Sequence, residues 1–355
     1  MNSLQTYGWN NNRQIEWSRL GISGAVPARV IADFGTSLKI ATPQIITAEL
    51  SGKLAHHSAR DQTPKVGDWV AVNISANGTA TVDSVVMRSN EIARKVAGKR
   101  AIKQIMAANI DIAFVLLALD NDFSVERLKR FLYQLFVSRI DAVIVLNKAD
   151  KTDDVQAYAT QLQQFGLPIR VCSATTGAGI DRIATMMKPG NTAVLLGSSG
   201  VGKSTLTNKL LGREVQKTNT VRESDSTGRH TTVHRELFLM QGGGMLIDMP
   251  GIRELQLWGS EEELDVSYDD VAQLIGQCKY TSCQHGSEQG CAIQRAISDG
   301  TLSEKHYANY VKMKTELSVL VQKNAERARQ INIRAKKSSL QKQAKNNHGS
   351  FLDEY

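Results

Sequence analysis

The sequence has few cysteines and no long apolar run, and both shortages restrict the class of protein. Its 355 residues include four cysteines, three of which lie together between Cys278 and Cys291. Such clustering suits a metal site in a reducing compartment better than a disulfide framework. The apolar runs, such as Ile112–Leu119, are far shorter than the roughly 20 residues that span a bilayer. We therefore expect no membrane-spanning helix.

The beginning of the chain also lacks the features of a secretory signal. The first twenty residues carry the polar run Asn10–Arg13 in their middle, without an apolar stretch or a small-residue cleavage site. We therefore expect a cytoplasmic protein. The sequence has neither an internal repeat nor a long apolar heptad pattern, so we expect a monomer.

Positive charge exceeds negative charge over the whole chain. The formal net charge is +8 and the pI is about 9.2. This excess fits a polyanionic partner such as nucleic acid, and equally a soluble basic protein without one. The tail from Lys323 to Lys345 is basic, with Glu326 as its only acid. Such a tail is solvated helix, disorder or an RNA-binding segment.

The length exceeds the usual span of one hydrophobic core, and we divide the chain into three domains, 1–98, 99–260 and 261–355. The first contains short β-rich runs separated by glycine, proline and Asn-Gly turn signals. This pattern predicts a small β-barrel, for which the oligonucleotide-binding (OB) type is the five-stranded candidate among other small barrels. The predicted strands are 28–34, 38–41, 45–50, 69–74 and 79–86.

The central domain alternates apolar runs with amphipathic stretches. Ile112–Leu119 and Ala142–Leu146 are apolar throughout, and Val125–Ser138 between them has a helical pattern. Buried parallel strands that alternate with helices form an α/β sheet. We predict one nucleotide-binding domain here, followed by a mainly helical third domain.

The strongest motif is Gly197–Ser204, which matches G-x-x-x-x-G-K-[ST] and directly follows the apolar run 192–196. A strand, a glycine loop and a helix start in this order direct backbone N–H groups at phosphates. Lys203 would contact the β- and γ-phosphates, and Ser204 would hold Mg²⁺. The predicted phosphate-binding residues are Gly197, Ser198, Ser199, Gly200, Val201, Gly202, Lys203, Ser204 and Thr205.

The choice of base is predicted by the segment Asn147-Lys148-Ala149-Asp150, which resembles the N-K-x-D motif of GTPases. In that motif the aspartate accepts hydrogen bonds from guanine N1 and N2. Adenine lacks this pair of donors, so it would leave the carboxylate unpaired. Ser173-Ala174 follows the next apolar run and resembles the motif whose backbone amide meets guanine O6. We expect GTP rather than ATP.

Two segments after the phosphate loop resemble the sensors of the γ-phosphate. Asp248-Met249-Pro250-Gly251 resembles D-x-x-G, in which Asp248 would bind Mg²⁺ through water and the Gly251 N–H would touch the γ-phosphate. The segment 228–232 resembles a first switch loop, and either Thr231 or Thr232 would complete the Mg²⁺ shell. In ordinary GTPases the phosphate loop and these two segments precede the guanine motifs. The order here is therefore that of a circular permutation, which changes connectivity and leaves the pocket intact.

Hydrolysis requires a group that orients the attacking water, and many GTPases place a glutamine directly after D-x-x-G. This chain has Ile252 there, which has no polar group. We expect slow turnover of the isolated protein and stimulation by a partner. His230 is the candidate water-positioning residue, with an ordinary loop histidine as the alternative.

Cys278, Cys283, His285 and Cys291 have the spacing C-x4-C-x-H-x5-C. Three thiolates and one imidazole suit a closed tetrahedral site, so we predict one structural Zn²⁺.

These motifs resemble those of the small-ribosomal-subunit-dependent GTPase A family, bacterial ribosome-assembly factors with a permuted GTPase domain. The resemblance covers residues 100–291, and the barrel-like amino-terminal region agrees with the OB domain of the family. It implies a GTP hydrolase for late maturation of the 30S subunit that binds near 16S rRNA. It also implies slow intrinsic hydrolysis, stimulation by the subunit and release on hydrolysis.

Three functions remain open on the sequence. The first is an rRNA-dependent GTPase of small-subunit assembly, and the second is a permuted GTPase that serves the large subunit or another RNA. The third is a scaffold that holds GTP without useful turnover. The family resemblance favours the first, and intact Lys203, Ser204 and Asp248 argue against the third.

Overall fold

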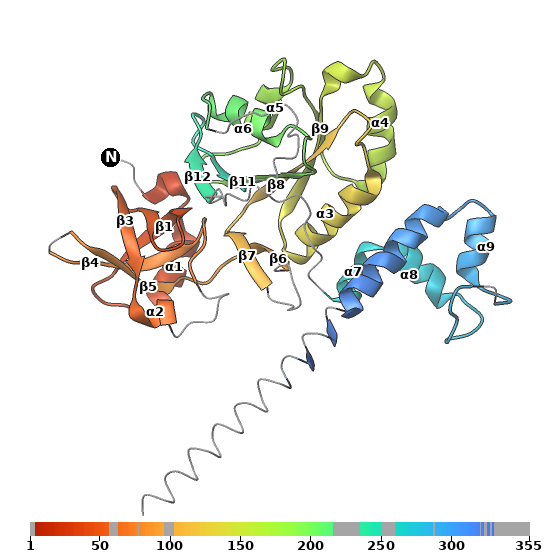
Figure 1. Ribbon diagram of the computed structural model, residues 1–355, viewed down its shortest axis with the longest axis horizontal. Coiled ribbons are helices and arrows are strands. Elements are labelled where there is room, and N and C mark those ends of the chain that lie inside the picture. The colour runs from red at the N-terminus through yellow and green to blue at the C-terminus, as the bar shows by residue number, and fades with distance from the viewer. Residues whose placement is uncertain are drawn as a thin grey trace, which may run out of the picture. The chain divides into compact units, whose positions relative to one another are not determined.

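The structure is a computed structural model that forms two compact units, residues 1–94 with 103–256 and residues 95–102 with 257–355 (Figure 1). The residues it describes are 4–56, 63–76, 78–95, 103–215, 235–249, 260–286, 288–319, 321, 322, 325, 326 and 329. In these parts of the chain, no helix has the length and apolar character needed to cross a membrane.

The first unit begins with a closed five-stranded barrel, as the sequence predicts. The strands follow one another in the order β1-β2-β3-β5-β4, and pairing of β4 with β1 closes the barrel. β3 and β5 are parallel, and the other barrel pairs are antiparallel. Alternate residues such as Val30, Ile40 and Val72 fill the barrel interior. The elements are β1 (Val26–Asp33), β2 (Leu38–Ala41), β3 (Ile45–Leu50), α2 (Gly52–His56), β4 (Trp69–Ile74) and β5 (Ala80–Val85).

The α/β sheet of the same unit has the order β10-β9-β8-β11-β13-β12, with β12 antiparallel to β13 and the other pairs parallel. Its strands are β8 (Ile112–Ala118), β9 (Asp141–Asn147), β10 (Ile169–Val171), β11 (Thr192–Gly197), β12 (Arg235–Leu239) and β13 (Met245–Asp248). Its helices are α3 (Val125–Val137), η2 (Ala149–Lys151), α4 (Val155–Leu162), η3 (Gln163–Phe165), α5 (Ile180–Ala184) and α6 (Lys203–Leu211). The predicted α/β class is confirmed.

Both faces of this sheet are covered, which explains why its strands read as continuous apolar runs. Along β8, Val115 and its alternate neighbours pack with Phe131 of α3 in one apolar cluster. Phe114 and its alternate neighbours pack with Ile183 of α5 and Leu206 of α6 in the other. Figure 1 shows α3 on one face of the sheet and α5 and α6 on the opposite face.

The barrel joins the α/β sheet through β12. Ala32 and Asp33 of β1 pair with Glu236 and Arg235, so the two parts share one 11-stranded sheet. The buried Arg29 guanidinium crosses the junction and donates hydrogen bonds to Thr192 Oγ1 and to backbone carbonyls. The remaining elements here are η1 (Leu4–Tyr7), α1 (Asn11–Arg19), β6 (Glu91–Lys95) and β7 (Lys103–Ala108). The boundary drawn between domains 1–98 and 99–260 stays a prediction.

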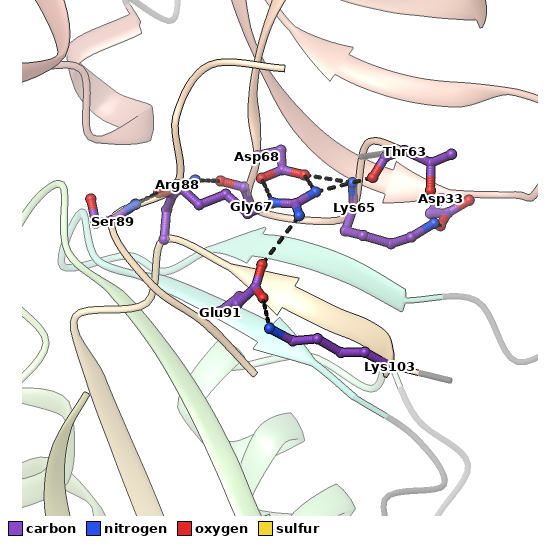
Figure 2. Close-up of polar contacts among 10 residues, drawn as sticks. Asp33, Thr63, Lys65, Gly67, Asp68, Arg88, Ser89, Glu91 and Lys103 are labelled. Atoms are coloured by element: carbon purple, nitrogen blue, oxygen red, sulfur yellow. Dashed lines mark hydrogen bonds and ion pairs between the residues drawn. The ribbon is translucent and has the colours of Figure 1, made fainter. Parts of the chain in front are cut away.

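A buried ion pair holds the edge of the barrel to the β6–β7 hairpin. The Arg88 guanidinium donates to both carboxylate oxygens of Asp68 at 2.8 and 2.7 Å. Figure 2 shows Arg88 between Asp68 and Glu91, with Lys103 on the far side of Glu91. Arg88 reaches Glu91 at 3.2 Å, and Lys103 pairs with Glu91 at 2.6 Å. The Asp68 side chain is fully buried, so it depends on Arg88 for its counter-charge.

The second unit is helical in its described residues, as the third domain was predicted to be. It contains α7 (Glu261–Ser267), α8 (Asp269–Gly276), α9 (Ala292–Ser298) and a further helix through 304–319. Ser260 and Glu263 form a capping box at the start of α7. The acidic run Glu261–Glu263 thus lies in a first helical turn, where negative charge is favourable.

Arg88→Ala should destabilise the barrel region strongly. We expect the free energy of unfolding to fall by about 3–5 kcal/mol, because the Asp68 carboxylate would stay buried without its cation. Trp9, Trp17 and Trp69 pack together in this region, so tryptophan fluorescence during denaturant unfolding reports the loss. Lys103→Ala is the matched control. Its pair with Glu91 is partly exposed, and we expect a cost of at most about 1 kcal/mol. Equal losses in the two variants would contradict the assignment.

Candidate functional site

The predicted phosphate loop connects the end of β11 to the start of α6, as a phosphate-binding loop must. Gly197, Gly200 and Gly202 all have positive φ angles, of 147°, 79° and 100°. A Cβ atom on Gly202 would collide with the Asn147 side-chain amide, and one on Gly197 would lie 2.7 Å from the Leu116 carbonyl oxygen. The loop therefore requires glycine at these two positions for both conformation and space.

Lys203 lies in the first turn of α6 and turns back over the loop. Its Nζ donates to the carbonyl oxygens of Gly197 at 2.8 Å and Ser198 at 2.6 Å. Burial lowers the pKa of Lys203 to about 8, although the nearby Asp248 charge favours the protonated form. An anion beside this amine would favour its protonated form and raise the pKa again.

Asn147 connects three loops at the carboxyl edge of the sheet. The side chain is buried, and its Nδ2 donates to the Val201 carbonyl of the phosphate loop at 2.8 Å. Its Oδ1 accepts a hydrogen bond from the Ala174 backbone N–H at 2.9 Å and a contact from the Cys172 thiol at 3.5 Å. The structure thus places the end of β9, the loop after β10 and the phosphate loop in direct contact.

The other residues of the predicted guanine loop point to separate partners. Lys148 has a left-handed backbone, with φ of 62°, and its Nζ lies 2.7 Å from Asp120 Oδ2. Asp150 Oδ1 accepts a hydrogen bond from Ser173 Oγ at 2.5 Å. That bond lowers the pKa of Asp150, so the carboxylate is kept as an acceptor. Asp150 and Ser173, which the sequence assigns to one base site, are therefore side by side.

The magnesium candidates are only partly within the described residues. Ser204 lies in the first turn of α6, and Asp248 is the last residue of β13. β13 pairs in parallel with β11, which places Asp248 at the same edge of the sheet as the phosphate loop. His230, Thr231, Thr232 and Gly251 lie outside the described residues, as do Ile252 and most of the basic tail.

The second unit brings its three predicted cysteines and one histidine together. The ligand atoms of Cys278, Cys283, His285 and Cys291 all lie within 4.8 Å of one another. The His285 Nδ1 atom is 3.5 Å from Cys278 Sγ and 3.7 Å from Cys291 Sγ. A tetrahedral Zn²⁺ with ordinary bond lengths would separate sulfur from nitrogen by about 3.6 Å. The cluster therefore fits this metal.

Backbone amides surround two of these sulfur atoms. The Ala292 N–H donates to Cys278 Sγ at 3.4 Å, and the Gln294 N–H donates to Cys291 Sγ at 3.5 Å. Both amides belong to the first turn of α9, whose helix dipole favours negative charge. These two sulfur atoms thus lie where thiolates, the form that binds metal, are favoured.

The acidic turn after β8 is part of the site but was not predicted from the sequence. Asp120 contacts Lys148, and Asp122 Oδ2 accepts a hydrogen bond from Ser198 Oγ of the phosphate loop at 2.5 Å. An Asp-x-Asp segment directly after a buried parallel strand was the available signal, since such strand ends meet at one edge.

The fold and the site define a class: a circularly permuted GTPase with an amino-terminal barrel and a helical Cys3His unit. The profile of the RsgA GTPase family matches residues 85–258. A Syntrophotalea carbinolica protein named "Small ribosomal subunit biogenesis GTPase RsgA" is 36% identical over 356 residues, which cover 97% of each chain. The chain belongs to the RsgA GTPase family, and it is accordingly a GTP hydrolase.

Two solved structures share the fold. YjeQ from Thermotoga maritima is 24% identical, with a TM-score of 0.59 over 82% of this chain and 98% of that one. YloQ, described as a circularly permuted GTPase, is 23% identical, with a TM-score of 0.58 over 83% of this chain and 96% of that one. Their agreement supports the architecture of barrel, permuted α/β domain and carboxyl-terminal helices.

Asn147→Asp should lower the stability of the nucleotide-free protein against unfolding. The replacement sets a carboxylate oxygen against the Val201 carbonyl, where an N–H now donates, so we expect a loss of about 1–3 kcal/mol. Thermal unfolding without nucleotide measures this loss. Asn12→Asp makes the same change at an exposed position of α1 and should have little effect. An unfolding temperature for Asn147→Asp that matches the control would refute the bridging role of this amide.

Proposed function

We propose that this protein is a GTPase that assists late maturation of the 30S ribosomal subunit. It binds the subunit and 16S rRNA, hydrolyses GTP slowly alone and faster with the subunit, and is released on hydrolysis. It acts as a monomer in the cytoplasm. The name of the Syntrophotalea carbinolica relative, a small ribosomal subunit biogenesis GTPase that covers 97% of the chain, supports the ribosomal role. The observation that carries the nucleotide assignment is the Asn147 side chain, which joins the predicted base and phosphate loops.

In this proposal, guanine is read by two elements that Asn147 holds together. Asp150 accepts hydrogen bonds from guanine N1 and N2, and the Ala174 segment faces the base edge. Ser173 supports the choice, because its hydroxyl binds Asp150 and keeps the pKa of that carboxyl low. Adenine lacks this pair of donors and would leave the carboxylate without them, which favours guanine.

The phosphates occupy the loop Gly197–Gly202, where backbone N–H groups of the loop and of the start of α6 are available to them. Lys203 exchanges its two loop carbonyls for phosphate oxygens, whose negative charge favours the protonated amine and raises its pKa from about 8. Ser204, Asp248 and either Thr231 or Thr232 hold Mg²⁺, which neutralises charge on the phosphates when bound. The Gly251 N–H contacts the γ-phosphate.

Slow intrinsic turnover follows from the position after D-x-x-G, where Ile252 cannot orient water. His230 is the proposed water-positioning residue. A partner that places the His230 imidazole near the attacking water would accelerate hydrolysis.

The Cys3His cluster holds one structural Zn²⁺ in this proposal. All four donor atoms belong to the protein, so the site is closed and leaves no position for a substrate. Such a metal stabilises a small helical unit, and we assign it no part in GTP hydrolysis. Its function is to keep the second unit folded.

Subunit specificity separates this proposal from its alternatives. We expect 30S subunits to raise the GTP hydrolysis rate of the purified protein at least tenfold, and 50S subunits to leave it within about twofold. Phosphate release under multiple turnover measures the rates. Stimulation by 50S alone would favour a large-subunit factor, and no turnover under any condition would favour a GTP-binding scaffold.

Asp150→Asn tests the guanine assignment. The amide presents a donor where guanine also presents donors, so we expect GTP affinity to fall about 100-fold and xanthosine triphosphate binding to improve. Equilibrium binding to both nucleotides measures the change. Asp153→Asn, at an exposed neighbouring position, should bind GTP as the wild type does. Undiminished GTP affinity in Asp150→Asn would reject this role.

Metal analysis tests the cluster. The purified protein should contain one zinc per chain, and Cys283→Ala should lose it under mild chelation because three ligands remain. Cys172→Ala is the control, since Cys172 lies in the other unit. Zinc-free wild type, or stoichiometric zinc in chelated Cys283→Ala, would exclude the proposed site.

A further inference from the structure

The turn Asp120–Phe123 lies between the two halves of the nucleotide site. It follows β8, which pairs with β9 on one side and with β11 on the other. The register places Ala118 opposite Asn147 and Leu116 opposite Gly197. The turn therefore starts at the carboxyl edge of the sheet, between the guanine loop and the phosphate loop.

The first carboxylate of the turn holds the guanine loop. Asp120 Oδ2 accepts a hydrogen bond from Lys148 Nζ at 2.7 Å, and its Oδ1 accepts one from the Asp122 backbone N–H at 2.9 Å. Partial burial raises the pKa of Asp120, but the hydrogen bond and charge of Lys148 outweigh this effect. The pKa is therefore lower than usual, and the group stays ionised. Both oxygens are thus occupied, one within the turn and one at Lys148.

The second carboxylate holds the phosphate loop. Asp122 Oδ2 accepts a hydrogen bond from Ser198 Oγ at 2.5 Å, and both of its oxygens lie 2.8 Å from Arg127 Nη1. Arg127 belongs to the first turn of α3, where its backbone N–H donates to the capping Ser124 side chain. Ser198 is thereby connected through Asp122 to a fixed point on a helix.

The turn itself is anchored. The Phe123 N–H donates to the Asp120 carbonyl at 3.0 Å, and the Phe123 ring packs edge-on against Tyr158 of α4 at 4.7 Å between centroids. These contacts hold the two carboxylates of the turn in fixed positions. Such preorganisation lowers the conformational entropy that binding would otherwise cost.

We propose that the turn Asp120–Phe123 is a positioning element of the nucleotide site, in which Asp120 fixes Lys148 and Asp122 fixes Ser198. Neither carboxylate touches the nucleotide in this proposal. Each acts through its partner, so that the guanine loop and the phosphate loop keep the spacing that one guanine nucleotide requires. The inference rests on the proposed GTP site and adds the residues that set its geometry.

A double-mutant cycle on Asp120 and Lys148 tests the first half. Binding of fluorescent GDP and GTP is measured for the wild type, Asp120→Ala, Lys148→Ala and the double variant. We expect Asp120→Ala to weaken both nucleotides about three- to tenfold, as for a partly exposed ion pair that positions a ligand group. In the Lys148→Ala background, Asp120→Ala should reduce nucleotide affinity less than about twofold. The kcat at saturating GTP should stay within about twofold of the wild type, so that the loss appears in KM.

The second half uses the same design on Asp122 and Ser198. Asp122→Ala should weaken GDP binding, and Asp122→Asn should restore most of it, because the amide oxygen still accepts from the Ser198 hydroxyl. The effect of Asp122→Ala should disappear in a Ser198→Ala background. Asp141→Asn, an exposed position at the opposite end of β9, serves as the charge-matched control and should bind as the wild type does.

The outcomes separate this inference from the proposed function. A wild type that does not prefer GDP to ADP would reject the guanine site itself. The wild type could instead show that preference, while the effects of Asp120→Ala and Asp122→Ala on nucleotide binding are absent or equal in both backgrounds. This result would reject only the positioning role. Equal effects together with a lower unfolding temperature would assign the turn to stability alone. If Asp120→Ala does not fold, Asp120→Asn replaces it, since the amide keeps the turn and loses only the charge.

Discussion

The nucleotide site depends on one buried amide. Asn147 is the only residue of the described chain for which hydrogen bonds to both the phosphate loop and the loop after β10 are found. Its Nδ2 donates a hydrogen bond and its Oδ1 accepts one, so an apolar or charged replacement cannot satisfy both partners. Because Gly202 packs against this amide, the glycine of one motif and the asparagine of another form a single packing unit. This contact makes the site independent of chain order, since it links strand ends rather than sequence neighbours.

Backbone pairing extends from the strands of the nucleotide site to the barrel. β13, which ends in Asp248, pairs with β11 of the phosphate loop and with β12, and β12 pairs in turn with β1 of the barrel. The barrel is therefore joined by backbone hydrogen bonds to the same sheet that positions the nucleotide. Arg29 reinforces this junction through its hydrogen bond to Thr192, and the Asp68–Arg88 ion pair holds the barrel edge to the β6–β7 hairpin.

The sequence predicted what periodicity and motif spacing encode, and it missed what depends on distant contacts. The predicted helix 125–138 is α3 (Val125–Val137), and the predicted barrel strands agree with β1 to β5 within two residues at each end. Strands β6 and β7 were missed, because Glu91–Lys95 and Lys103–Ala108 lack a clear apolar alternation. The partners of Lys148 and Ser198 could not be predicted either. They depend on β8 lying between β9 and β11, which only the sheet order reveals.

Amide hydrogen exchange with GDP and with ADP tests the central claim most directly, namely that three loops form one guanine nucleotide pocket. With GDP, we predict simultaneous protection of residues 147–150, 173–174 and 197–204, with little protection by ADP at the same concentration. Protection of 197–204 alone, or equal protection by the two nucleotides, would contradict the claim. It would show that the phosphate loop binds without the base loops that Asn147 connects to it.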